Sequence, residues 1–294
     1  MAGFPGGDKL HIIYEGPPRV ENGMTVEGDQ FFLAGDRAQQ ARQGVELARG
    51  MSGILRPTLE YRYDTSANQP GSTFVDYVGS RREISCAINV FGDTPQRWRE
   101  NWRRWVLNNP PDREGKLWFK TSDGVDRYAF VRPNENAGLS SIDIDPNILR
   151  KLEGLEWGWK SDYPYFFGES LRFDFAGGPT ATVTVNNPSD VAVVYPRLYL
   201  PGPGSYGVGE GGRSWEITTP NLTADEVVRI NFDPMRQTYV KRNMKTGKVT
   251  NLWYMLRGKR PELELAPGQS THRLRVPANG KPWIEFTPMF QGAM

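Results

Sequence analysis

The chain has 294 residues and a mass of 33.3 kDa, enough for two domains that each bury a core without disulfide or metal cross-links. Aromatic residues make up 12% of the chain and include nine Trp, so the composition excludes a disordered protein. The 36 Lys and Arg residues nearly balance the 34 Asp and Glu residues, and a net charge of +2 gives no electrostatic basis for binding nucleic acid or an anionic membrane.

Residue types that often carry catalysis or bind metals are scarce. The single cysteine, Cys86, excludes an internal disulfide, and with only His11 and His272 the chain lacks the ligands of a zinc site. We expect no catalytic residues, no metal and no cofactor. No apolar run approaches the roughly 18 residues of a membrane span, and residues 1–8 lack the features of a secretory signal. The sequence therefore predicts a soluble protein of a reducing compartment, without membrane insertion.

The first third of the sequence predicts short strands separated by turns. Residues 10–14, 30–33 and 59–63 have strand patterns, residues 36–43 favour a helical turn, and the polar stretch 64–72 is typical of a long exposed loop. Over residues 83–91, positions 84, 86, 88 and 90 share one face of a strand. Cys86 lies on that apolar face with no histidine near it in sequence, which favours core packing over a nucleophilic role.

The clearest helix signal follows that strand. Thr94 and Pro95 are residue types preferred at the N-cap and the first helical position. Over residues 96–107 the helical spacing predicts an apolar stripe of Trp98, Trp102, Trp105 and Val106, with Arg97, Arg99, Arg103 and Arg104 on the other side. Such a helix could contact nucleic acid by charge and stacking. A Trp stripe at this spacing more often packs on a sheet, and we favour that interpretation.

After the helix, the sequence predicts only strands. Runs at 116–120 and 127–131 flank Ser122-Asp123-Gly124, a strong hairpin signal. Beyond a break near residues 168–178, about nine short strands are expected, at 180–186, 191–200, 213–219, 226–232, 236–242, 248–256, 262–265, 271–276 and 282–287. This density is typical of a β-sandwich or jelly roll. We therefore expect a mainly β protein with two domains, residues 1–170 with a helix at about 95–108, and residues 171–294.

Several short motifs match functional patterns without the context that those functions require. Gly202-Pro203-Gly204-Ser205-Tyr206-Gly207 fits a dinucleotide-binding string, but a strand is expected after it instead of the necessary helix. The run that begins at Asp143 lacks the Gly and Glu of a calcium loop. Glu262 and Glu264 would share a strand face, where paired surface carboxylates are common. We interpret all three as turns or solvated surface.

Aromatic residues in the second half leave a binding role open. Sugar rings stack on exposed aromatic side chains, as in carbohydrate-binding modules. The candidates for such a role are Tyr199, Tyr206, Trp215, Trp253, Tyr254 and Trp283. The strand alternation assigns at least half of these to the core. A β-rich glycoside hydrolase that uses two carboxylates is a weaker alternative.

In the order of its parts, the sequence resembles the distal tail proteins, or minor tail proteins, of long-tailed phages (siphophages), particularly those of actinobacterial hosts. The resemblance covers most of residues 44–290. Its motifs in the first half are Gly44-Val45-Glu46-Leu47, Pro70-Gly71-Ser72-Thr73-Phe74, the Trp and Arg helix, and Tyr163-Pro164-Tyr165-Phe166. Those in the second half are Val185-Asn186-Asn187-Pro188-Ser189-Asp190, Ile230-Asn231-Phe232-Asp233-Pro234 and Ile284-Glu285-Phe286-Thr287-Pro288.

This resemblance implies a structural adapter and not an enzyme. Residues 1–170 would form a tail-tube-like β-barrel or sandwich with one flanking helix, and six copies would make a ring that continues the tail tube. Residues 171–294 would form a galectin-like β-sandwich facing the baseplate hub and receptor-binding proteins. The tape measure protein and DNA would only pass through the lumen, and the protein would be assembled in the host cytoplasm and reside at the virion tail tip. Edge strands and loops such as 64–80 are expected sources of the ring interface.

Overall fold

The computed structural model describes residues 10–21, 23–35, 43–66, 70–121, 124, 126–135, 137–138, 145–176, 180–191, 193–208, 217–258, 260–275 and 280–294. The chain divides into two compact units. Unit 1 comprises Met1–Gly168 together with Phe290–Met294, and unit 2 comprises Glu169–Met289. The sequence placed the domain boundary at residue 170 and assigned the last five residues to the second domain, whereas the chain returns to unit 1 at Phe290.

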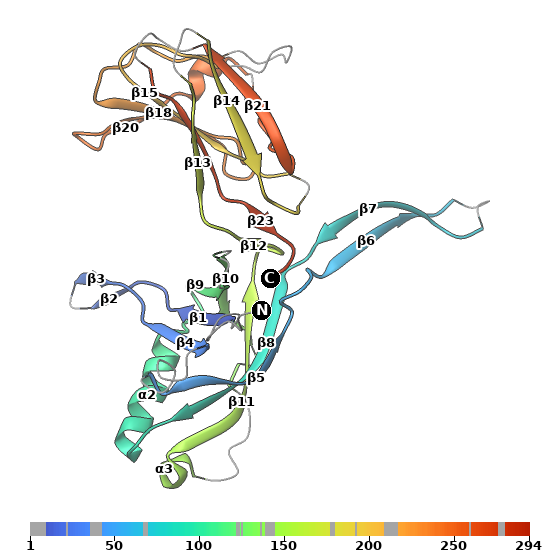
Figure 1. Cartoon of the computed structure of the whole chain (residues 1–294), viewed down its shortest axis with the longest axis vertical. Helices are drawn as coiled ribbons and strands as arrows, with labels where there is room; N and C mark the ends of the chain where they lie inside the picture. The colour runs from blue at the N-terminus through green and yellow to red at the C-terminus, as the bar shows by residue number, and fades with distance from the viewer. Residues whose placement is uncertain are drawn as a thin grey trace, which may run out of the picture. The chain divides into compact units, whose positions relative to one another are not determined.

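Unit 1 is built on one large antiparallel sheet with the strand order β4-β1-β9-β10-β11-β8-β5 (Figure 1). These strands are β1 (His11–Glu15), β4 (Gln30–Ala34), β5 (Val45–Ser52), β8 (Arg82–Phe91), β9 (Gly115–Lys120), β10 (Arg127–Pro133) and β11 (Lys151–Ser161). Two short strands, β12 (Phe166–Phe167) and β23 (Met289–Phe290), pair with each other beside β10. Separate from this sheet are the ribbons β2 (Arg19–Glu21) with β3 (Met24–Val26) and β6 (Leu59–Asp64) with β7 (Thr73–Gly79).

The large sheet curves round an apolar core. Its curvature brings the first strand in the order, β4, next to the last, β5. Alternate residues of β8 point into this core: Ile84, Ile88 and Val90 are fully buried. Cys86 lies on the same face and is buried, and burial raises the pKa of its thiol to about 12. The expected strand face and the packing role of Cys86 are confirmed.

The long helix α2 (Pro95–Leu107) packs on this core. The Thr94 side chain accepts a hydrogen bond from the Arg97 backbone N–H at 3.1 Å, the predicted N-cap. Trp98 and Trp105 are buried as expected, and Asn101 is buried between them, with its side-chain nitrogen donating to the Phe91 carbonyl at 2.7 Å. The inclusion of Val106 in the apolar stripe was wrong: it is 44% exposed, because the buried face runs through positions 98, 101 and 105. The short helix α3 (Pro146–Leu149) precedes β11.

Unit 2 consists of two facing antiparallel sheets (Figure 1). The six-stranded sheet has the order β13 (Leu171–Asp174), β22 (Trp283–Phe286), β15 (Arg197–Pro201), β18 (Glu226–Asn231), β19 (Thr238–Asn243) and β20 (Val249–Asn251). The four-stranded sheet has the order β14 (Thr180–Asn187), β21 (Gly268–Arg275), β16 (Gly207–Val208) and β17 (Ile217–Thr218). Inward side chains such as Val183, Leu198, Ile230 and Ile284 are buried between the sheets, which is the packing of a β-sandwich.

Three of the expected strands in unit 2 are wrong in part. The run 248–256 ends as a strand at Asn251, whose side chain accepts the Trp253 backbone N–H, and continues as the 3-10 helix η1 (Trp253–Leu256). The run 191–200 forms a strand only from Arg197, after Pro196. Residues 262–265 form no strand beyond one bridge between Leu265 and Val194, and they follow Pro261, which has no N–H for a ladder.

The prediction of a mainly β protein, with one flanking helix in its first part and a β-sandwich in its second, is confirmed. The hairpin of β9 and β10 around Gly124 is also as predicted, although Ser122 and Asp123 lie outside the described residues. So do residues 36–42 of the expected helical turn and 213–216 of an expected strand. In the described part of the chain, no helix is long and apolar enough to cross a membrane.

Candidate interaction surfaces

The ribbon of β6 and β7 is exposed along almost its whole length, and we call its two strands, residues 59–64 and 73–79, the arm. It projects away from the curved sheet (Figure 1). The expectation of a loop over residues 64–80 was therefore wrong in part, because Thr73–Gly79 forms a strand along β6. A two-stranded ribbon alone is marginally stable in water, so a surface that covered this arm would stabilise it.

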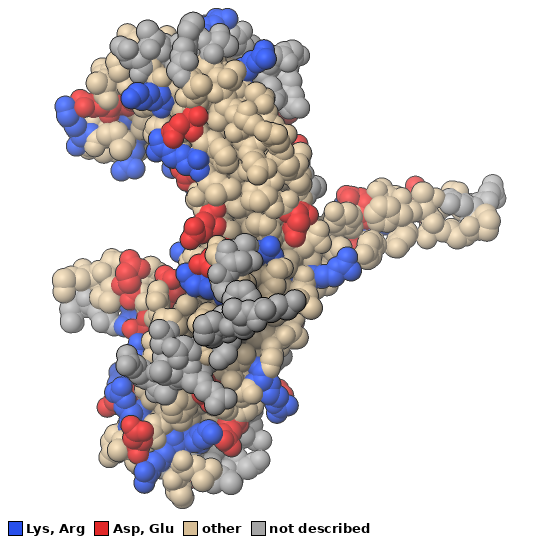
Figure 2. Space-filling view, viewed as in Figure 1, with Lys and Arg blue, Asp and Glu red and all other residues tan. Residues whose placement is uncertain are grey.

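One face of the arm is aromatic. The strand register places Tyr61 opposite Tyr77 and Tyr63 opposite Phe74. The Phe74 ring packs edge-on against both tyrosines of β6, with ring centroids 6.2 and 6.1 Å apart. All four side chains stay between 46 and 58% exposed. The opposite face carries Glu60, Arg62 and Asp76, and the arm's visible surface in Figure 2 is mostly uncharged. Four half-exposed aromatic rings on one face are typical of an interaction surface.

A buried arginine holds the root of the arm. The Arg82 side chain is 1% exposed and lies over the Phe166 ring, 4.4 Å from its centroid. Its guanidinium donates to four backbone carbonyls from three separate segments: Gly53 and Arg56 before the arm, Pro164, and Gln291. Burial lowers the pKa of Arg82 to about 10. The guanidinium of an arginine suits this position, because its five N–H donors lie in one plane and can reach backbone carbonyls that approach from several directions.

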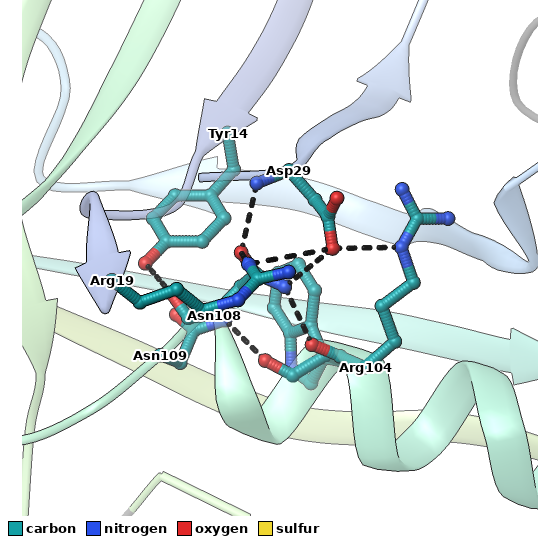
Figure 3. Close-up of polar contacts among 7 residues, drawn as sticks. Tyr14, Arg19, Asp29, Arg104, Asn108 and Asn109 are labelled. Atoms are coloured by element: carbon teal, nitrogen blue, oxygen red, sulfur yellow. Dashed lines mark hydrogen bonds and ion pairs between the residues drawn. The ribbon is translucent and has the colours of Figure 1, made fainter. Parts of the chain in front are cut away.

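A polar cluster fixes the C-terminal end of α2 to the loop before β4 (Figure 3). The Asn108 side chain accepts from the Asp29 backbone N–H at 2.9 Å and from Arg19 at 3.0 Å, and donates to the Asp29 carboxylate at 2.8 Å. Arg104 donates to the same carboxylate at 2.9 Å. Burial tends to raise the pKa of Asp29, but hydrogen bonds from Arg104 and Asn108 and the charges of Arg104 and Arg19 outweigh it, so this pKa lies below its usual value.

This cluster, with the packing of α2, argues against a nucleic-acid contact on the helix. Trp98 and Trp105 are buried and offer no face on which a base could stack. Arg104 pairs with Asp29 and lies over the Phe31 ring, 5.1 Å from its centroid. Arg97 pairs with Glu100 within the helix. The expectation that the Trp stripe packs on the sheet is thus confirmed for Trp98 and Trp105.

Unit 2 has a groove of about 310 Å³ on the solvent face of its six-stranded sheet. Its lining combines aromatic, aliphatic and basic side chains: Tyr199, Pro201, Ala224, Glu226, Val227, Arg229, Val240, Arg242, Met244, Val249 and Trp283. Tyr199 and Trp283 are opposite each other on β15 and β22, and their rings stack with centroids 4.9 Å apart. The Arg172 guanidinium, from the strand on the other side of β22, lies 4.3 Å from the Trp283 ring centroid.

The other aromatic residues considered for sugar binding are less suitable. Tyr206 is fully buried, and its hydroxyl donates to the Pro201 carbonyl. Tyr254 is 75% exposed on η1, outside the groove, and Trp253 beside it is half-buried. Trp215 lies outside the described residues. Tyr199 and Trp283 are therefore the two aromatic residues of the set that line a concave surface.

The remaining sequence motifs lie apart from these surfaces. Glu262 and Glu264 are exposed and lie outside any strand, so the expected shared strand face was wrong. Residues 202–206 form a loop between β15 and β16, Gly207 begins β16, and the next element that the structure describes is the strand β17. Asp143 lies outside the described residues. Among the described residues there is no group of three or more His, Cys, Asp or Glu side chains that could hold a metal ion.

Solved structures provide the informative comparison, since no protein-family model and no curated protein matches the sequence. The Dit protein of phage SPP1, described as a paradigm of the hub adsorption apparatus in phages that infect Gram-positive bacteria, superposes with a TM-score of 0.63 at 15% identity, over 96% of this chain and 99% of that one. The fold is that of SPP1 Dit. A chain of the phage P2 baseplate in its activated conformation with Ca gives a TM-score of 0.56 at 10% identity, over 95% of this chain and 98% of that one. The same baseplate with Sr gives 0.53 at 10% identity, over 95% and 97%.

Proposed function

We propose that this chain is a structural virion protein, the distal tail adapter of a long-tailed phage of the actinobacterial type. Six copies form a ring that joins the tail tube to the baseplate hub and to the receptor-binding proteins at the tail tip. The fold shared with SPP1 Dit over nearly the whole chain supports this assignment. It agrees with the sequence resemblance, which covers most of residues 44–290.

The observation that carries the proposal is the aromatic face of the arm. A ring of identical subunits needs a heterologous interface, in which one patch on each copy meets a different patch on the next. A projecting arm provides one such patch. Covering four half-exposed aromatic side chains contributes on the order of 10 kcal/mol per copy. That is comparable with the roughly 4–15 kcal/mol cost of losing translational and rotational freedom, so the arm is strong enough to contribute decisively to assembly.

The role of the ring is mechanical. The tape measure protein and DNA pass through its lumen without being bound, which is compatible with a net charge of +2, because a strongly basic chain would retain the phosphate backbone. Unit 1 would contact the tail tube protein and its own neighbours. Unit 2, the β-sandwich that we expected to be galectin-like, would face the hub and the receptor-binding proteins.

The arm can be tested with two matched variants. Replacing Tyr61, Tyr63, Phe74 and Tyr77 by Ser removes the aromatic face, while replacing Glu60, Arg62 and Asp76 by Ser alters the other face of the same ribbon. We expect the wild type and the second variant to associate, and the first variant to remain a monomer, as measured by light scattering across concentration. Equal association of both variants would show that the aromatic face does not form the ring interface.

Carbohydrate binding is the second candidate, favoured by the place of Tyr199 and Trp283 in the groove. Trp283 is poorly suited to stack on a sugar, because its ring already has two partners. The Tyr199 ring stacks on it from the strand on one side of β22, and the Arg172 guanidinium lies over it from the strand on the other side. Tyr199 lines the groove and has Trp283 stacked on its ring. The lining of the rest of the groove indicates a different ligand.

A further inference from the structure

The groove of unit 2 is formed by two rows of side chains that cross the six-stranded sheet. One row runs from Trp283 through Tyr199 and Arg229 to Val240, each opposite the next in the strand register. The second row, two residues along, runs from Pro201 through Val227 and Arg242 to Val249. Met244 and Ala224 complete the apolar lining. The groove is therefore an aliphatic surface with one aromatic end and two arginines.

The two arginines have no acidic neighbour in these rows. Arg229 lies between Tyr199 and Val240, and Arg242 between Val227 and Val249. Neither side chain makes a hydrogen bond or ion pair with any residue that the structure describes. They are diagonal neighbours on adjacent strands, a separation that long side chains can bridge. Figure 2 shows several basic side chains, with acidic ones among them, around β15, β18 and β20 of unit 2. Two such guanidinium groups can donate hydrogen bonds to the same carboxylate, or to two carboxylates of one ligand.

The one acidic residue of the lining is already engaged. The Glu226 carboxylate pairs with Lys241 at 2.7 Å and accepts the Thr223 backbone N–H at 3.0 Å. Sugar hydroxyls in the groove would find few partners beyond the two arginines, because the other lining residues are aliphatic or aromatic. Polar groups buried without hydrogen bonds cost free energy. The aliphatic lining instead suits the side chains of Leu, Ile, Val or Phe.

We propose that this groove binds an acidic peptide segment of a partner protein, with carboxylates on Arg229 and Arg242 and apolar side chains on the floor of the groove. This proposal rests on the proposed function, in which unit 2 carries the next component of the tail tip, and it states the chemistry of that attachment. A saccharide with carboxylate groups is the competing occupant that the experiment must distinguish.

The experiment selects peptides from a random displayed library on the immobilised full chain. We expect enriched sequences that combine Asp or Glu with Leu, Ile, Val or Phe. A synthetic, fluorescein-labelled peptide of the enriched sequence is then titrated by fluorescence anisotropy. The double variant Arg229→Gln, Arg242→Gln should bind it about tenfold more weakly or worse, since charge-assisted hydrogen bonds are lost. The control Arg273→Gln, an exposed arginine on the other sheet, should bind like the wild type.

Three results decide the proposal. Enriched peptides that lack acidic residues, or whose binding is the same in the double variant, would overturn it. Binding of polygalacturonate that is lost in the double variant, with no peptide enriched, would replace the peptide by an acidic saccharide. The mass of each variant is measured in parallel, so that the two proposals can fail separately. A monomer that still binds the acidic peptide contradicts the ring and leaves the groove assignment standing. A ring that does not bind the peptide contradicts the groove assignment and leaves the ring standing.

Discussion

The side chain of Asn108 fills the space between the end of α2 and the loop before β4, and it is 1% exposed. Replacing it by Ala would leave the Asp29 backbone N–H without its acceptor and remove a donor from the Asp29 carboxylate. We expect Asn108→Ala to lower the free energy of unfolding by about 2–4 kcal/mol, measured by urea denaturation. Arg103→Ala, on the exposed side of the same helix, is the control and should change it by less than about 0.5 kcal/mol.

The Asp29 carboxylate gives this cluster a pH dependence of known sign. Because its pKa in the folded protein lies below the unfolded value, its contribution to stability is present above the unfolded pKa of about 3.9 and is lost as the pH falls through the folded pKa. We expect the stability difference between wild type and Asp29→Asn to be largest near neutral pH and to shrink below about pH 4. A difference that stays constant across this range would show that the charge of Asp29 is not what stabilises the cluster.

At the scale of elements, the arm is separable from the sheet that carries it. None of its four aromatic side chains belongs to the core of unit 1, so shortening the arm should leave that core intact. Replacing residues 61–77 by Asn-Gly joins the opposed pair Glu60 and Val78 through a favourable two-residue turn. We expect the free energy of unfolding of unit 1 to change by less than about 0.5 kcal/mol. A large loss of stability would mean that the arm is part of the fold and not an assembly device.

Local signals explain which elements the sequence could predict. The helix α2 has its N-cap, first-turn proline and Trp spacing within one short segment, and β8 has apolar residues at every second position from 84 to 90, so both were predictable. The strand β7 was not, because it has no buried face and its partner β6 lies beyond a polar turn. The run Thr73–Val78, rich in β-branched and aromatic residues, was the available signal. The groove depends on the register of five strands from distant parts of the chain, which no local pattern contains.

At the scale of the whole molecule, the two units have separate cores. We therefore expect calorimetry of the full chain to show two transitions. Asn108→Ala should lower the transition of unit 1 and leave that of unit 2 in place, since Asn108 belongs to unit 1 alone. A single transition that moves as a whole would show that the units unfold together.

The most direct test of the adapter is the mass of the assembled protein, measured by light scattering across concentration, with negative-stain images of the same sample. Six copies of a 33.3-kDa chain weigh about 200 kDa. A species of that mass which appears as a six-fold ring is the result that the account predicts. A chain that remains a monomer at every concentration, alone and with purified tail tube protein, would contradict it.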